Sequence, residues 1–178
     1  MKVITAVEDY TPTEKDVCVF LAGGITNCWE WQDAVIKELQ KKEGLDDLVI
    51  FNPRRKNFPI GNPDASKEQI EWEFKWLERM DIFSMYFTGG DSDQPICMYE
   101  LGRNILRMQM RFPVSWVQRL VITCEEGYRR KDDVCIQTEL ATGSSFARVV
   151  NKYSIREHVS QIRGRYWILK KRYGDNPI

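Results

Sequence analysis

The apolar and polar positions along the chain predict short buried strands that alternate with helices. Largely apolar runs occupy residues 17–22, 48–51, 81–87 and 119–124, and each ends in glycine, proline or polar residues. Runs of this length and composition are typical of parallel strands that are covered on both faces. Residues 133–137 predict either a fifth strand or the start of a helix.

Apolar residues at helical spacing fill the segments between these strands. They indicate one helix that ends at Gly44, a second that begins at a capping box of Ser66 and Gln69, and a third from near Met98 to about Arg111. The positions expected to face the core are Ile70, Phe74 and Leu77 in the second helix and, in a last helix over residues 153–171, Ile155, Val159, Ile162 and Trp167.

Strands that alternate with helices predict an α/β fold. We interpret the chain, residues 1–178, as a single doubly wound, flavodoxin-like domain with a mainly parallel five-stranded sheet. Its core is expected at residues 16–140 and a C-terminal helical extension at residues 141–178. In a sheet of strand order 2-1-3-4-5, a ligand crevice opens at the carboxyl ends of the first and third strands.

Two segments would face each other across that crevice. Gly23 and Gly24 follow the first strand, while Glu100 follows the third and is expected in the first turn of a helix. An acid at that position can simply complement the helix dipole, worth up to about 1 kcal/mol. The convergence of the two segments favours a site, and Gly102 would let the helix approach the sheet closely.

A second carboxylate, Glu73, borders the apolar stripe of the helix before the third strand, where it needs a partner. A salt-bridged surface acid is the alternative. Trp72 and Trp76 would form either a wall for a flat ligand or part of the core, and aromatic pairs at this spacing are more often core.

Two carboxylates in one cleft are the groups that glycosyl transfer requires. One attacks or stabilises the anomeric carbon, and the other manages the proton on the leaving group. Glu100 and Glu73 are the candidates for this pair, and Asp91 or Asp93 could replace Glu73 in the second role.

Arg54, Arg55 and Lys56 follow the second strand, and paired guanidinium groups suit a phosphate. A solvated basic loop is an equal alternative. The sequence has no full P-loop pattern, so nucleotide-driven phosphoryl transfer is disfavoured. His158 is the only histidine, which leaves little material for histidine-based nucleophilic or metal chemistry. We expect no cofactor and no metal.

The composition limits the classes of partner that the protein is expected to bind. Lys plus Arg and Asp plus Glu number 26 each, so no net charge attracts nucleic acid or an anionic membrane, and small molecules are favoured. The five cysteines include no C-x-x-C pair, which argues against a disulfide framework and a zinc site. The first residues do not resemble an export signal, and no apolar run is long enough to span a membrane. We therefore expect a soluble, cytoplasmic protein.

Four segments together resemble the nucleoside 2-deoxyribosyltransferase-like family, over roughly residues 16–140. They are Phe20-Leu21-Ala22-Gly23-Gly24, Asn52-Pro53-Arg54-Arg55, Trp72-Glu73 and Tyr99-Glu100-Leu101-Gly102. The resemblance implies that Glu100 attacks C1′ of a 2′-deoxynucleoside and that Glu73 contacts the nucleobase. Better-known members of this family carry Asp-x-Gly-Thr/Ser just before the nucleophile. Here Asp93 is displaced by one place, or another group takes its role in holding the sugar hydroxyls.

By this resemblance, 2-deoxyribose passes between nucleobases by double displacement through a covalent glycosyl-glutamate. The resemblance also implies a homo-oligomer whose sites are completed by a neighbouring subunit. The alternatives are a 2′-deoxynucleoside 5′-monophosphate N-glycosidase, in which water completes the reaction, and a non-catalytic nucleotide-binding module. The residues expected to bind the substrate are Ala22, Gly23, Gly24, Arg54, Trp72, Asp93 and Gly102.

Overall fold

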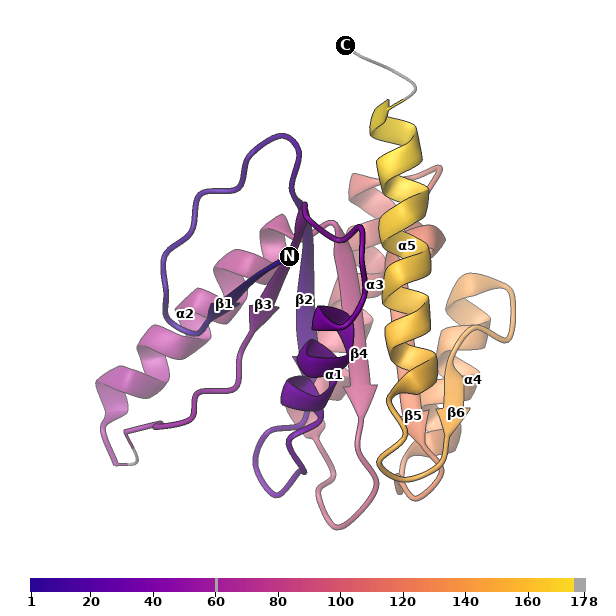
Figure 1. The fold of residues 1–178 in the computed structure, drawn as a ribbon. Coiled ribbons are helices and arrows are strands. Elements are labelled where there is room, and N and C mark those ends of the chain that lie inside the picture. Colours follow the sequence, from indigo (N-terminus) through magenta and orange to yellow (C-terminus); the bar gives the residue numbers. More distant parts are fainter. Residues whose placement is uncertain (60, 175–178) are drawn as a thin grey trace.

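The computed structural model describes residues 1–59 and 61–174, with side chains up to residue 171. A sheet of six parallel strands forms its centre (Figure 1). In spatial order these are β1 (Lys2–Thr5), β3 (Leu48–Asn52), β2 (Val17–Gly23), β4 (Ile82–Phe87), β5 (Leu120–Glu125) and β6 (Arg148–Val150). From β3 onward this is the predicted 2-1-3-4-5 order, so the flavodoxin-like fold is confirmed.

Helices cover both faces of the sheet. α1 and α5 pack on one face, in front of the strands in Figure 1, and α2, α3 and α4 pack on the other. Their bounds are α1 Trp31–Gln40, α2 Pro63–Arg79, α3 Pro95–Arg111, α4 Lys131–Thr142 and α5 Arg156–Gly174, with a 3-10 helix, η1, at Trp116–Arg119. Among the residues described, no helix is long and apolar enough to cross a membrane.

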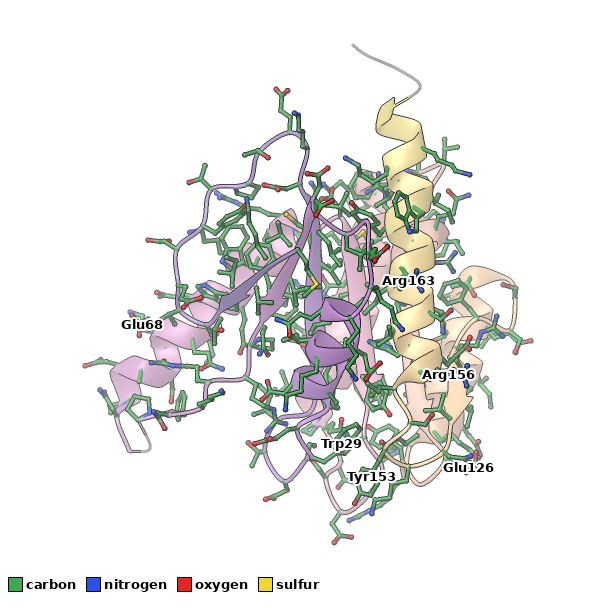
Figure 2. All side chains as sticks on the ribbon, in the orientation of Figure 1. Trp29, Glu68, Glu126, Tyr153, Arg156 and Arg163 are labelled. Carbon is green, nitrogen blue, oxygen red and sulfur yellow. The ribbon has the colours of Figure 1, made fainter. Side chains whose placement is uncertain are left out.

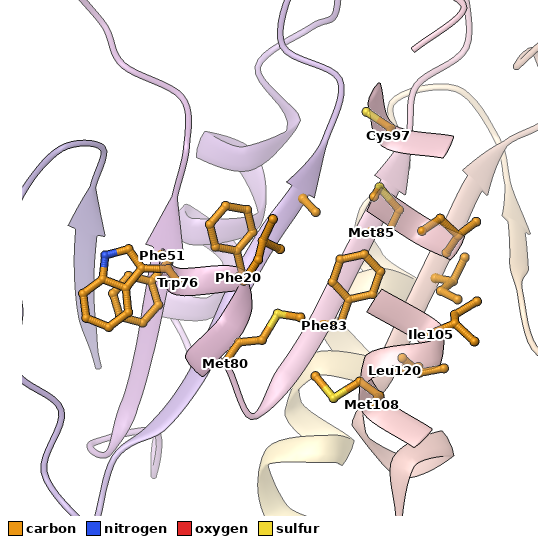
Figure 3. Close-up of a cluster of buried hydrophobic side chains, with 14 of the residues drawn as sticks. Phe20, Phe51, Trp76, Met80, Phe83, Met85, Cys97, Ile105, Met108 and Leu120 are labelled. Carbon is orange, nitrogen blue, oxygen red and sulfur yellow. The ribbon is translucent and has the colours of Figure 1, made fainter. Parts of the chain in front are cut away.

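The two covered faces explain why the central strands β3, β4 and β5 are buried at every position and are largely apolar. In β2, Val19 and Leu21 pack beneath α1 and α5, while Phe20 and Ala22 pack against the helices of the opposite face. Figure 3 shows the second of these clusters, in which the rings of Phe51 and Trp76 stack with centroids 3.9 Å apart. A strand covered on both sides has no solvent-facing position for a polar residue.

The predicted number of strands was wrong by one. β1 adds an edge strand beside β3, with Lys2 opposite Val49, in a region whose mixed polarity gave no strand pattern. An edge strand keeps one side open to solvent, so it needs no continuous apolar run. The fifth strand of the predicted order is β6, and residues 133–137 belong instead to α4.

The predicted start of α2 was also wrong, and of its three predicted core positions only Leu77 is buried. The helix begins at Pro63, where the Asn62 side chain accepts a hydrogen bond from the Asp64 N–H at 3.0 Å, so Ser66 and Gln69 lie inside it. Ile70 and Phe74 are 64% and 54% exposed. The residues that α2 buries are Ala65, Trp72, Trp76 and Leu77. Trp72 and Trp76 pack against aromatic side chains on this face of the sheet. The helix is therefore turned so that Ile70 and Phe74 face outward.

Two further helix boundaries differ from the prediction. α3 begins at Pro95, about a turn earlier than expected, so Glu100 stands in the second turn and not the first. α5 begins at Arg156. It buries Val159 and Ile162 as predicted, but Trp167 is 43% exposed.

Candidate active site

A cavity of about 240 Å³ opens where β2 and β4 end, on the side of the sheet covered by α2 and α3. Its volume lies just below the range of roughly 300–1,000 Å³ that is usual for ligand pockets, which favours a small occupant. The residues around it are Phe20, Ala22, Gly23, Gly24, Ile25, Thr26, Pro53, Glu73, Ser92, Gln94, Pro95, Ile96, Cys97 and Glu100. The structure thus brings together five predicted site residues: both glutamates, Ala22 and the two glycines.

The two carboxyl groups enter the cavity from different helices, Glu73 from α2 and Glu100 from α3. Burial raises the pKa of Glu73, although a hydrogen bond of 2.8 Å from Gln69 Nε2 to Glu73 Oε1 partly opposes the rise. Burial together with the nearby charge of Glu73 raises the pKa of Glu100 to about 7. Two such groups titrate as a pair, and this pair releases its last proton near neutral pH.

This arrangement can perform two tasks at once. With one proton shared between the two carboxyl groups, one can be an anionic nucleophile while the other is an acid. The walls are largely apolar, from Phe20, Ile25, Pro53 and Ile96, so the carboxylates are poorly screened. Within the described residues, no group of three or more His, Cys, Asp or Glu side chains is placed to hold a metal ion.

The two glycines of the β2–α1 loop are required by close packing. Gly23 has φ +148°, and a Cβ there would lie 2.3 Å from the backbone oxygen of Tyr86. A Cβ on Gly24 would lie 2.4 Å from Cys28 Sγ and 2.6 Å from Gln94 Oε1. The loop therefore passes against β4 and the start of α3, which closes one side of the cavity.

Arg54 holds this loop and does not face the cavity. Its Nε donates to Gln32 Oε1 at 2.9 Å. Its Nη2 lies 3.1–3.4 Å from the backbone oxygens of Gly24, Ile25, Cys28 and Trp29. These contacts stabilise the loop. They leave the guanidinium unavailable to a phosphate, which its position in the sequence had suggested as a ligand.

Three other predicted substrate-binding residues also lie away from the cavity lining. Trp72 is 5% exposed, packs against Phe20 and Phe51, and donates from its indole N–H to the Glu8 backbone oxygen at 2.8 Å, so it belongs to the core. The Asp93 carboxylate lies 3.5 Å from Arg129 on the outside of its loop. Gly102 is exposed, and a Cβ there would meet nothing within 4 Å. Its expected role in bringing α3 close to the sheet is therefore wrong.

Sequence reasoning missed Gln94, which stands next to Asp93 and does face the cavity. It is 4% exposed, adopts a left-handed conformation at φ 47° before the first turn of α3, and donates from Nε2 to the Thr88 backbone oxygen at 2.8 Å. The left-handed turn directs Asp93 outward and Gln94 inward. Only the proline that follows hinted at an unusual backbone here.

These features define an α/β domain with a paired-carboxylate cavity at the carboxyl edge of a parallel sheet. A family model described as nucleoside 2-deoxyribosyltransferase like matches residues 16–114, which is more than half of the chain. The chain belongs to this family. The matched segment contains Glu73, Glu100, Gly23 and Gly24. No curated protein matches the chain.

The raised pKa of Glu100 predicts that this residue destabilises the fold at high pH. Below pH 4.5 the carboxyl group is protonated in both the folded and unfolded states, so it has no effect. As the pH rises to about 7, only the unfolded state releases the proton freely, and folding becomes less favourable. Glu100→Gln should therefore raise the free energy of unfolding by roughly 2 kcal/mol at pH 8 and hardly at all at pH 4.

Urea denaturation at both pH values measures this difference. Glu139→Gln, at an exposed position on α4, is the matched control and should change stability by less than about 0.5 kcal/mol at either pH. An equal effect of Glu100→Gln at the two pH values would contradict the prediction.

Proposed function

We propose that this protein transfers 2-deoxyribose between nucleobases, with Glu100 as the nucleophile and Glu73 as the acid and base. The observation that carries the proposal is that two partly buried carboxyl groups, both with raised pKa, line one small cavity in a member of this family. Family membership supports nucleosides and nucleobases as the substrates.

In the first half of the proposed reaction, the Glu100 carboxylate attacks C1′ of a 2′-deoxynucleoside. The bond between C1′ and the base nitrogen breaks, its electrons stay on the base, and Glu73 supplies the proton that neutralises the base. A second base then attacks C1′, the ester bond to Glu100 breaks, and Glu73 takes up the proton of the incoming base. Two inversions at C1′ give retained configuration.

The protonation states of the pair fit this sequence. The hydrogen bond from Gln69 favours the ionised form of Glu73, while burial and the charge of Glu73 favour the protonated form of Glu100. The reactive form carries the proton on Glu73 and the charge on Glu100. An electron-poor C1′ next to Glu100 and a basic nitrogen next to Glu73 both favour that rearrangement.

The cavity supports a nucleoside over a 5′-monophosphate. Its described lining contains no lysine or arginine, and Arg54 is already engaged by loop carbonyls. A phosphate would thus enter a site with two carboxyl groups and no cation. This weighs against the monophosphate N-glycosidase, although water could still replace the second base with a nucleoside substrate.

The direct test is chromatography of the purified protein with a panel of 2′-deoxynucleosides, each with and without a free acceptor base. A new deoxynucleoside should form only with the acceptor. Glu100→Ala should lower the rate at least about a thousandfold, because the covalent route is lost. Glu139→Ala, on the exposed side of α4, should retain full activity. Base release that no acceptor accelerates would indicate the hydrolase, and a fully active Glu100→Ala variant would exclude the mechanism.

Glu73→Gln should affect leaving groups unequally. Bases that leave poorly without protonation should slow by about 100-fold or more, and bases that leave readily should slow less. Removing the neighbouring charge also lowers the pKa of Glu100, so the pH at which the nucleophile ionises should fall. Steady-state rates across pH for two bases measure both effects. Equal losses for all bases would count against the assigned role.

We further propose that a second copy of this chain covers the outer face of α2 and α3. This α2–α3 face carries exposed apolar side chains next to the cavity: Ile70, Phe74, Ile96, Tyr99, Leu106 and Met110, between 54% and 77% exposed. Glu78 on α2 pairs with Arg103 and Arg107 on α3, which holds the two helices side by side. Contiguous apolar surface of this kind marks an association site, and Ile96 carries it to the cavity itself.

Light scattering after size exclusion tests the second copy. The wild-type protein should be a dimer or larger, and Leu106→Lys should shift it toward monomer and lower the transfer rate. Leu140→Lys, on α4 and even more exposed than Leu106, should change neither. A monomeric wild-type protein would refute this proposal without bearing on the roles of the glutamates.

A further inference from the structure

We propose that a second site, on the opposite face of the sheet from the cavity, binds a nucleotide through its phosphate chain. The site is a groove of about 640 Å³ between α1 and the first turns of α5. Its cations are Lys42, Arg156 and Arg163, one carboxylate, Glu38, also lines it, and its other polar groups come from Tyr153, Ser154 and Ser160. Figure 2 labels Arg163, Arg156 and Tyr153 in descending order along α5 and the loop before it.

The three cations of this groove have no carboxylate partners among the described residues. Glu38, which lines the groove, pairs with Lys41 and also feels the charge of Lys42, and Glu157 lies 3.9 Å from Arg148. The two arginines stand seven residues apart on α5, so both project from the same side of the helix. The groove therefore concentrates positive charge on a protein whose net charge is zero.

Arg163 adds a sign that the groove is incomplete without a ligand. Its Nε is buried and has no hydrogen-bond partner. A buried donor without an acceptor is unfavourable, and a phosphate that drew the guanidinium into the groove would give it an acceptor and offset its charge. The hydroxyl groups of Ser154 and Ser160 and the N-terminal end of the long helix α5 supply further donors to an anion.

Tyr153 supplies the feature that points to a nucleotide instead of phosphate alone. Its backbone is left-handed at φ 64°, and its N–H donates to the buried Glu125 Oε1 at 2.8 Å, which holds this conformation. The ring is 58% exposed and packs edge-on against Trp29, with centroids 5.2 Å apart. Lys152 Nζ lies over one face of the ring, 4.9 Å from its centroid, and a nucleobase that stacks on the ring would use the other face.

Calorimetric titration with three probes tests the site, using ATP, inorganic tripolyphosphate and adenosine in low and high salt. ATP should bind most tightly, tripolyphosphate more weakly and adenosine least, and salt should weaken the first two. Arg163→Gln and Arg156→Gln should each weaken binding of both phosphates roughly tenfold, while Lys171→Gln, exposed farther along α5, should not.

Tyr153→Asn separates the two parts of the ligand. Asparagine accepts a left-handed backbone, so the loop keeps its shape while the ring is lost. ATP should then bind no better than tripolyphosphate. Equal binding of the two probes to the wild-type protein would overturn the assignment of a nucleotide.

Two results would overturn the site itself. One is no binding of either phosphate probe in low salt, and the other is an equal loss in Lys171→Gln and Arg163→Gln, which would indicate diffuse attraction. The outcome of this test is independent of the proposed transfer reaction. Glu100→Ala, which should lack transfer activity, should still bind ATP like the wild-type protein. A loss in Glu100→Ala would place the nucleotide in the cavity and also overturn the proposal.

Discussion

The carboxylate of Glu125 is the interaction on which the carboxyl edge of the sheet depends. It is fully buried at the end of β5 and accepts four hydrogen bonds. The donors are Trp29 Nε1 at 2.8 Å, the Tyr86 hydroxyl at 3.0 Å, the Tyr153 N–H at 2.8 Å and the Gly89 N–H at 2.6 Å. A buried carboxylate is tolerated only with such a complete set of donors. Three of the donors lie in the loops after β2, β4 and β6, and Tyr86 lies in β4, so one side chain ties these three loops to the sheet.

Glu73 and Glu100 differ from Glu125 in having few hydrogen-bond donors around their carboxyl groups. Glu73 receives one hydrogen bond, from Gln69, and both acids have a raised pKa, whereas the carboxylate of Glu125 is surrounded by donors. The fold thus bears an electrostatic penalty at the cavity that it avoids at Glu125, the last residue of β5. Partly buried carboxyl groups with few hydrogen-bond donors and a raised pKa are typical of functional sites more than of groups that stabilise a fold. The hydrogen bonds to Glu125 offset part of that penalty, because they hold the loops beside the cavity in place.

The sequence predicted the parts of the molecule that follow from burial alone. β2 is apolar from Val17 to Ala22, and β4 is apolar apart from the buried Ser84, because both faces are covered, and the motif around Glu100 pointed to a residue that lines the cavity. Polar side chains were harder, because their partners lie far away in the sequence. Nothing near Arg54 shows that four carbonyl oxygens of another loop surround its guanidinium. The rotation of α2 was likewise set by the shape of the sheet, which took in Trp72 and left Ile70 outside.

The parallel sheet also explains why the cavity and the Tyr153 end of the groove lie at one edge. All six strands end on the same side, so every loop that follows a strand is available there, on either face. The cavity uses the face of α2 and α3, and the groove uses the face of α1 and α5. Glu125 lies between them and binds Gly89, on the loop that leads to Gln94, with one oxygen and Tyr153 with the other. A ligand that moved Tyr153 would therefore shift the Glu125 carboxylate, and through it the loop around Gly89 that leads to the cavity.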